Sequence, residues 1–343
     1  MQKKPQKRRK RRKKGQKSMT DFPSLSLDEV CDRLLAADRP IVISHTRPDG
    51  DTIGAAAALC RLFALLRKRA AWACADPLPR RLAFLFDGID LATPEENAGG
   101  TVIAIDVASP AQLGTLRGVH TTSLMIDHHE SGEPFAPAYI CPTAAAAGEI
   151  LYTIAARMVE RGDIPALTVE IGGALYAAIS SDTGCFKYAN VTPYTHRVAA
   201  ALLSLGVQAD KINHLLYDSR SAGQLAAEKI ALSRLTTRHG GRIAAVCLSL
   251  ADRAGLPDED FETAVDIARS MAGVEIAVAI RELTGGQCKV SLRSTDADVA
   301  AVAQSFGGGG HLRAAGCMVN GEPEDALSVL LPSLIAALNK AHK

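Results

Sequence analysis

The alternation of short apolar runs with longer helix-forming segments is the feature that most constrains the fold of this chain. Buried strands are indicated by five apolar runs, at residues 40–44, 70–75, 82–86, 101–105 and 123–126. Helices are indicated at 55–69, 144–161, 167–180 and 193–205. Near-continuous apolar strands that alternate with helices are typical of α/β proteins, so we expect a mostly parallel sheet flanked by helices.

A second, smaller α/β region follows a polar, helix-forming stretch. Strands are expected at 242–250, 275–283 and 288–294, with helices at 263–272 and 298–306 and a glycine-rich turn at 307–310. We therefore predict four segments: a disordered basic tail at 1–18, a catalytic domain at 19–205, a helical linker at 206–238 and a second domain at 239–343. A cleft is expected between the two domains.

The charge of the chain is divided unevenly. Residues 1–18 hold eleven Lys and Arg and no acidic residue, and the other 28 basic against 37 acidic residues leave a formal charge of −9. A run of like charges is expected to be disordered and has little specificity. Three interpretations of the tail stay open: non-specific contact with nucleic acid, a solvated appendage without a role, or residues upstream of a true start at Met19.

Several classes of protein are disfavoured by composition. No apolar run approaches the ~18 residues that span a bilayer, and no apolar segment follows the basic N-terminus as in a secretory signal. The eight cysteines are scattered without a CxxC pair, which argues against a disulfide framework or a thiolate zinc site. We expect a cytoplasmic enzyme. The sequence leaves the oligomeric state open, a homodimer included.

Aspartate and histidine side chains follow the predicted strands at the same end. The segment Ser-His-Thr-Arg-Pro-Asp-Gly-Asp follows the first strand, Asp106 follows the run at 101–105, and Asp-His-His follows the run at 123–126. Asp182 comes after the helix at 167–180. Because ligand sites of open α/β sheets lie beyond the carboxyl ends of the strands, we expect these side chains to converge.

Crowded carboxylates repel one another unless cations neutralise them. Oxygen and imidazole ligands without thiolate suit Mn²⁺, with Mg²⁺ as the alternative. The ligands are too many for one ion, and a two-ion site suits an in-line displacement at phosphorus.

The four motifs, in this order, resemble those of the DHH phosphoesterase superfamily. The segment Gly-Gly-Gly-Gly-His-Leu-Arg-Ala-Ala-Gly at 307–316 is similar to the signature of its accessory DHHA1 domain. The resemblance implies that His45 and Asp49 hold one metal ion, that Asp51, His128 and Asp182 hold the other, and that Asp106 bridges both. It also implies that a water attacks phosphorus, that His129 donates to the phosphoryl oxygen, and that Asp127 orients the histidine pair.

The accessory domain is expected to bind the rest of the substrate. Gly308, Gly309 and Gly310 can bring backbone N–H groups close to a phosphate, because no Cβ obstructs the approach. The resemblance adds His311 and Arg293 as anchors for a second phosphate or a nucleotide end. A guanidinium suits a phosphate because it donates two parallel hydrogen bonds.

The chain resembles the compact two-domain members of the superfamily, and this resemblance implies an enzyme that hydrolyses short oligoribonucleotides (nanoRNA) to mononucleotides. A second expected activity is dephosphorylation of 3′-phosphoadenosine 5′-phosphate (pAp). The alternatives are a phosphodiesterase for pApA or cyclic di-AMP and, in a different class, a nucleic-acid-binding module without chemistry. A module of that kind is expected to have lost one of the six metal ligands, and none is lost.

Overall fold

The structure is a computed structural model that describes residues 22–91, 99–118, 121–130 and 132–342; the predicted tail at 1–18 lies outside the described residues. The chain divides into two compact units, residues 1–219 and 220–343. The predicted linker at 206–238 is shared between them, so the boundary at 219/220 falls inside it. Among the described residues, no helix is long and apolar enough to cross a membrane.

The first unit is built on a six-stranded sheet in the order β3-β2-β1-β4-β5-β6, in which every neighbouring pair is parallel. Its strands are β1 (Ile41–Ile43), β2 (Ala71–Ala73), β3 (Asp90–Leu91), β4 (Val102–Ile105), β5 (Thr122–Asp127) and β6 (Ala138–Ile140). The parallel sheet predicted from the apolar runs is confirmed. The run at 82–86 is the exception, because it lies in the 3₁₀ helix η1 (Arg80–Phe86).

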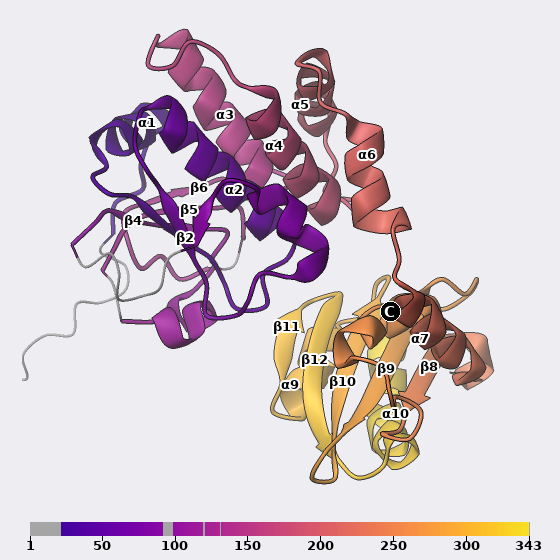
Figure 1. Ribbon diagram of the computed structural model, residues 1–343. Coiled ribbons are helices and arrows are strands. Elements are labelled where there is room, and N and C mark those ends of the chain that lie inside the picture. The colour runs from indigo at the N-terminus through magenta and orange to yellow at the C-terminus, as the bar shows by residue number, and fades with distance from the viewer. Residues whose placement is uncertain (1–21, 92–98, 119–120, 131, 343) are drawn as a thin grey trace, which may run out of the picture. The chain divides into compact units, whose positions relative to one another are not determined.

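Five helices contribute to the large core on one side of this sheet (Figure 1). They are α1 (Leu27–Ala36), α2 (Gly50–Leu65), α3 (Ala147–Glu160), α4 (Val169–Asp182) and α5 (Pro193–Ser204). Of these, α2 and α3 lie directly against the strands. The large core lies between the helices and side chains such as Val42, Ile103 and Ile126. The opposite face is covered by the 3₁₀ segment η2 (Pro110–Leu116) through Leu113 and Leu116.

Helices α2 and α4 approach each other closely because residues with small side chains lie between them. A Cβ added at Gly54 would lie 2.6 Å from the carbonyl oxygen of Ala174 and 2.8 Å from the amide nitrogen of Ala178. The first turn of α2 and the last turn of α4 both carry predicted metal ligands, Asp51 and Asp182. The glycine therefore permits the close approach of these two helices.

After α5, the helix α6 (Ala209–Asn213) and the π-helical turn η3 (His214–Asp218) pack on the first unit. The Ser180 hydroxyl donates to Asn213 Oδ1 at 2.8 Å, and the Tyr217 hydroxyl donates to the carbonyl of Ser180 at 2.5 Å. The N-terminal half of the predicted linker is thus part of the first unit.

The second unit has a six-stranded mixed sheet in the order β11-β12-β10-β9-β8-β7. Its strands are β7 (Leu235–Arg238), β8 (Ile243–Leu248), β9 (Ile276–Leu283), β10 (Gln287–Ser294), β11 (Gly309–His311) and β12 (Ala314–Asn320). The predicted hairpin of β9 and β10 is confirmed. The predicted glycine-rich turn is shorter than expected, because residues from Gly309 onward pair with β12.

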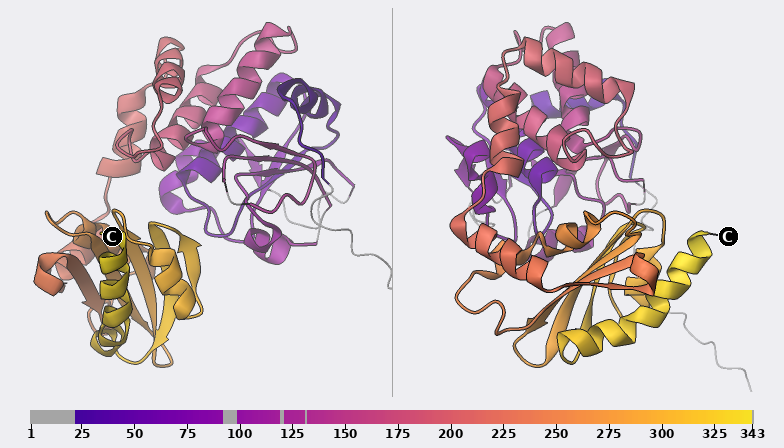
Figure 2. Two further views of the ribbon diagram at one scale, coloured as in Figure 1. Left: turned by 180° about the vertical axis from the view of Figure 1, so that it is seen from behind. Right: turned by 90° about the vertical axis from the view of Figure 1, so that its right-hand side faces the viewer.

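Helices lie on both faces of the second sheet. The helices α7 (Ala222–Ser233) and α8 (Ala264–Arg269) pack on one face, and α9 (Val299–Ser305) and α10 (Pro323–Ala341) pack on the other. The right-hand view of Figure 2 shows α10 running along its face. Two short 3₁₀ turns, η4 (His239–Gly241) and η5 (Asp258–Phe261), complete the unit.

Candidate metal centre

The loop between β1 and α2 places three of the predicted ligands at the carboxyl end of the sheet. Asp49 is the N-cap of α2, and its carboxylate accepts from the Thr52 N–H at 3.1 Å. Asp51 lies in the first turn of that helix. His45 precedes the helix, with its Nδ1 2.8 Å from the carbonyl oxygen of Thr46, which leaves Nε2 for the centre of the site.

Asp51 is held by the N-terminus of α3. Its two carboxylate oxygens accept from the backbone N–H groups of Ala147 at 2.6 Å and Gly148 at 2.9 Å. Burial, together with the charges of Asp106 and Asp182, raises the pKa of Asp51 well above its ordinary value. A buried carboxylate beside other carboxylates favours a cation as its neighbour.

Asp106 follows β4 directly and lies at the middle of the site. Its backbone has a φ of 57°, a left-handed conformation that is uncommon for residues other than glycine and is a feature of functional sites. Its Oδ2 lies 3.6 Å from His45 Nε2, and its Oδ1 lies 3.5 Å from His128 Nε2. Oδ1 is buried and has no hydrogen-bond partner. A buried carboxylate oxygen without a donor indicates a missing positive partner.

His128 is oriented by a backbone group. Its Nδ1 lies 3.3 Å from the carbonyl oxygen of Ala144, so Nε2 faces the carboxylates of Asp51 at 3.7 Å, Asp106 at 3.5 Å and Asp182 at 3.7 Å. Burial opposes protonation of this ring. The contact with Asp106 and the surrounding carboxylates nevertheless raise the pKa of His128 to about 10.

The pKa values of other acidic and imidazole groups in the site are also raised, which means that bound positive charge is favoured there. Burial lowers the pKa of His45, but its contact with Asp106 and the charge of Asp49 raise the net value to about 9. Burial raises the pKa of Asp182 to about 6, in opposition to the nearby His128. The ligand cluster therefore binds either protons or metal cations.

His129 is paired with Asp127, which was predicted to orient both histidines, whereas His128 is held by the Ala144 carbonyl instead. The Nδ1 of His129 lies 2.7 Å from Oδ1 of Asp127, which is fully buried at the end of β5. Burial lowers the pKa of His129, but the hydrogen bond to Asp127 outweighs it and the net pKa is raised. Asp127 thus fixes the orientation of the His129 ring.

The predicted site residues form three overlapping groups, and within each group the possible ligand atoms lie within 4.8 Å of one another. The groups are His45–Asp49–Asp106, Asp51–His128–Asp182 and Asp106–His128–His129. The donor set consists of carboxylate oxygen and imidazole nitrogen without thiolate, which fits Mn²⁺ or Mg²⁺. The first two groups correspond to the two ligand sets that the resemblance implies, and the third connects them.

Thr52 is a site residue that sequence reasoning missed. Its hydroxyl lies 2.5 Å from His45 Nε2 and also donates to Oδ2 of Asp106. It follows Asp51 in the helical first turn, and that adjacency is the only signal the sequence offers. The Ala144 carbonyl and the α3 amides were also missed, because backbone groups leave no residue-type signature.

In the second unit, Arg293 and His311 lie opposite the same residue of β12. Ala314 pairs with Arg293 of β10 on one side and with His311 of β11 on the other. Arg293 is half-buried, and its guanidinium donates to the carbonyl of Leu292 at 3.0 Å.

The glycines of the signature have different roles. A Cβ at Gly308 would lie 2.2 Å from the carbonyl oxygen of Gly316, and Gly310 has a φ of 143° with a Cβ position 2.5 Å from the carbonyl oxygen of Ala314. These two glycines are required by the pairing with β12. A Cβ at Gly309 would meet nothing within 4 Å, so of the three glycines predicted to approach a phosphate only Gly309 has open space beside it.

Comparison with known proteins agrees with the site. The model of the DHH family, N-terminal domain, matches residues 39–179, and that of the DHHA1 domain matches residues 240–340. The bifunctional oligoribonuclease and PAP phosphatase NrnA of Thermus thermophilus is 34% identical over 300 residues, which cover 85% of this chain and 88% of that protein. The chain belongs to the DHH family of phosphoesterases.

Further relatives extend the match. The protein of the same name from Bacillus subtilis is 25% identical over 82% of this chain and 90% of its own length. The crystal structure of an exopolyphosphatase-related protein from Bacteroides fragilis superimposes with a TM-score of 0.84 at 24% identity, covering 92% of this DHH-family chain and 97% of that one. The structural similarity to the Bacteroides fragilis protein shows that the two chains share a fold.

Proposed function

We propose that this protein hydrolyses short oligoribonucleotides to mononucleotides and also dephosphorylates pAp. The observation that carries the proposal is the pair of ligand groups joined through Asp106 and His128. A second observation supports the same function: a relative named for both activities matches this chain over 88% of its own length.

Under this proposal two divalent ions share the site. His45 and Asp49 would hold one ion, Asp51, His128 and Asp182 would hold the other, and Asp106 would contact both. The two oxygens of Asp106 face different histidines, which supports a bridging role for its carboxylate. Mn²⁺ is our first choice and Mg²⁺ the alternative, on the basis of the mixed carboxylate and imidazole donors. When bound, the ions would neutralise the charge that develops on the phosphoryl, attacking and leaving oxygens.

The protein's own groups contribute orientation and hydrogen bonding. His129, held by Asp127, is proposed to donate a hydrogen bond to a phosphoryl oxygen as negative charge develops there. The Asp127 carboxylate favours this role because it stabilises the imidazolium form, in which both ring nitrogens carry a proton. Asp106 and His129 are therefore the proposed catalytic residues.

The second unit is proposed to bind the remainder of the substrate. Arg293, His311 and the backbone of Gly308 to Gly310 would anchor a second phosphate or the nucleotide end. The shared register of Arg293 and His311 opposite Ala314 supports a common binding role. Of the three glycines, Gly309 has the space that close approach of a phosphate requires.

Two further expectations complete the proposal. No disulfide bond joins cysteines in the described part of the chain, and a reducing compartment is consistent with that, so we propose a cytoplasmic location. Single-stranded RNA of a few nucleotides, dinucleotides and pAp are the proposed partners.

Turnover on four substrates tests this function. A dinucleotide, pAp, pApA and cyclic di-AMP are each incubated with the full chain and Mn²⁺, with a chelated sample as the control. We expect hydrolysis of the dinucleotide and of pAp that depends on the metal. Hydrolysis of cyclic di-AMP alone, or of none of the four by metal-loaded protein, would contradict the proposal.

A further inference from the structure

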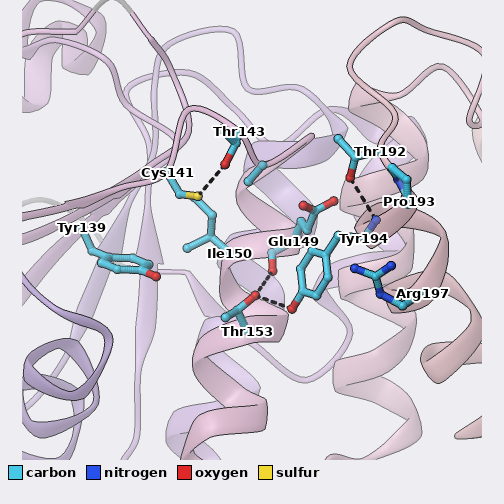
Figure 3. A pocket seen from close by; sticks show the side chains of 11 residues that line it. Tyr139, Cys141, Thr143, Glu149, Ile150, Thr153, Thr192, Pro193, Tyr194 and Arg197 are labelled. Carbon is cyan, nitrogen blue, oxygen red and sulfur yellow. Dashed lines mark hydrogen bonds between the residues drawn. The ribbon is translucent and has the colours of Figure 1, made fainter.

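A pocket of about 490 Å³ lies in the first unit (Figure 3). One of its lining residues, Ala144, contacts His128 of the metal centre. The pocket is lined by residues that follow or belong to β6, by α3 and by the N-terminal turn of α5, among them Tyr139, Glu149, Ile150, Tyr194 and Arg197. Its volume falls within the ~300–1,000 Å³ typical of small-molecule sites. None of these five residues is a predicted metal ligand or substrate residue.

Glu149 gives this pocket an acceptor that lacks a donor. The residue is only 2% exposed, and its Oε2 is buried without a hydrogen-bond partner. The Thr195 side chain and the Ala145 backbone bind the carboxylate, but they leave this oxygen unpaired. Since a buried acceptor without a partner is unfavourable, a ligand that supplies an N–H group would stabilise it.

The pocket also offers an aromatic ring and a cation. The guanidinium of Arg197 lies over the Tyr194 ring, 5.5 Å from its centroid. Arg197 is exposed, and within the described parts of the chain it has no ion-pair partner. An aromatic face suits a nucleobase, and an Arg without a partner suits a phosphate.

We propose that this pocket binds AMP, with the 6-amino group of the base donating to Glu149 and the 5′-phosphate bound by Arg197. The choice of a nucleotide follows from the pairing of a lone acceptor, an aromatic ring and a guanidinium in one pocket. The choice of AMP rests on the proposed function, because removal of the 3′-phosphate from pAp yields AMP.

A ligand here would act on the metal centre through two backbone contacts. The Ala144 carbonyl that orients His128 belongs to a residue lining the pocket. Glu149 directly follows Ala147 and Gly148, whose N–H groups hold Asp51. Movement of this segment on ligand binding would therefore shift one ligand group, so the product would regulate its own formation.

Calorimetric titration of the full chain in EDTA tests the proposal without turnover. AMP and IMP are compared because IMP carries a carbonyl acceptor where AMP carries the 6-amino donor. We expect AMP to bind at least about fivefold tighter than IMP, the lower limit for one base-edge contact. Glu149→Gln should abolish this preference, whereas Glu160→Gln, an exposed carboxylate on the same helix, should retain it.

Equal affinity for AMP and IMP, no binding of either, or a preference that survives Glu149→Gln would overturn the proposal. If Glu149→Gln does not fold, as judged by the fluorescence of Trp72, Arg197→Ala serves in its place and should weaken AMP at least about fivefold more than adenosine. Failure of hydrolysis with AMP binding intact would refute only the proposed function. Hydrolysis without the AMP preference would refute only this site.

Discussion

Asp106 is the residue that connects the two histidines of the metal centre through different oxygens of one carboxylate. We expect Asp106→Asn to lower dinucleotide turnover by about 10³-fold or more, because an amide bridges two cations poorly. Metal content measured after dialysis should fall from two ions per chain. The control is Asp38→Asn, an exposed carboxylate outside the site. Asp106→Asn protein with two ions and full turnover would refute the bridging role.

Thr52 is a positioning residue whose hydroxyl binds both His45 and Asp106. Replacement by valine keeps the shape and removes the hydroxyl, so we expect the affinity for Mn²⁺ to fall by about 10–100-fold. Thr52→Ser should restore most of it. Titration calorimetry with Mn²⁺ measures both variants. A serine variant as weak as the valine variant would indicate that methyl packing, not the hydroxyl, is what matters.

The sequence was sufficient to predict which acidic and imidazole side chains lie together, because they have distinctive chemistry and lie near strand ends. It was insufficient for the groups that orient them. The Ala144 carbonyl and the amides of Ala147 and Gly148 come from a run of small residues that resembles any helix start. Gly308 and Gly310 were predicted to approach a phosphate, yet their nearest neighbours are backbone atoms of β12.

At the scale of elements, the contact between α2 and α4 depends on Gly54. We expect Gly54→Ala to destabilise the first unit by about 1–3 kcal/mol, because the new Cβ would meet backbone atoms that cannot move aside. Gly173→Ala in α4 is the matched control, since its Cβ would meet only Ile212 Cδ1 at 3.7 Å. Urea unfolding followed by Trp72, the single tryptophan, measures both. Equal stability of the two variants would show that the helices can separate freely.

In the second unit, an ion-pair cluster connects the starts of β8 and β9 to the end of α10. Glu275 accepts from Arg242 at 2.5 Å and contacts His342 at 2.6 Å, and these bonds lower its pKa to about 2. A lowered pKa gives stability that is fully present above the ordinary value of 4.5 and is lost as the pH falls toward 2.

Glu275→Gln should therefore reduce hydrogen-exchange protection of β9 at pH 7. The difference in protection between the variant and the unchanged protein should become smaller as the pH falls from 4.5 to 2. Glu262→Gln, a surface carboxylate of the same unit, is the control. A difference that stays constant across that range would show that the carboxylate charge contributes nothing.

Much of the fold followed from the apolar runs, and the errors have physical causes. The run at 82–86 is as apolar as a strand, but it packs as a 3₁₀ helix against the core through Leu82, Leu85 and Phe86. β3 has two residues and β6 has three, which is too short for a periodic signal. The predicted linker was assigned from its polar character, although Ala227 and Ala231 of α7 are buried in the second unit.

At the scale of the whole molecule, the acidic excess and the metal centre are connected. Four of the proposed ligands are aspartates, and two divalent cations would bring the formal charge of −9 for residues 19–343 to about −5. The bound cations thus reduce repulsion of an anionic substrate at the point where it reacts. On this account substrate binding does not depend on the basic tail.

Rates of hydrolysis across RNA length test the central claim most directly. The full chain is loaded with Mn²⁺ and given 5′-labelled RNAs of two to twenty-four nucleotides at equal concentration. The account predicts metal-dependent release of mononucleotides that is fastest for dinucleotides and falls as length increases. Equal rates at all lengths, or no release by protein that holds both ions, would contradict it.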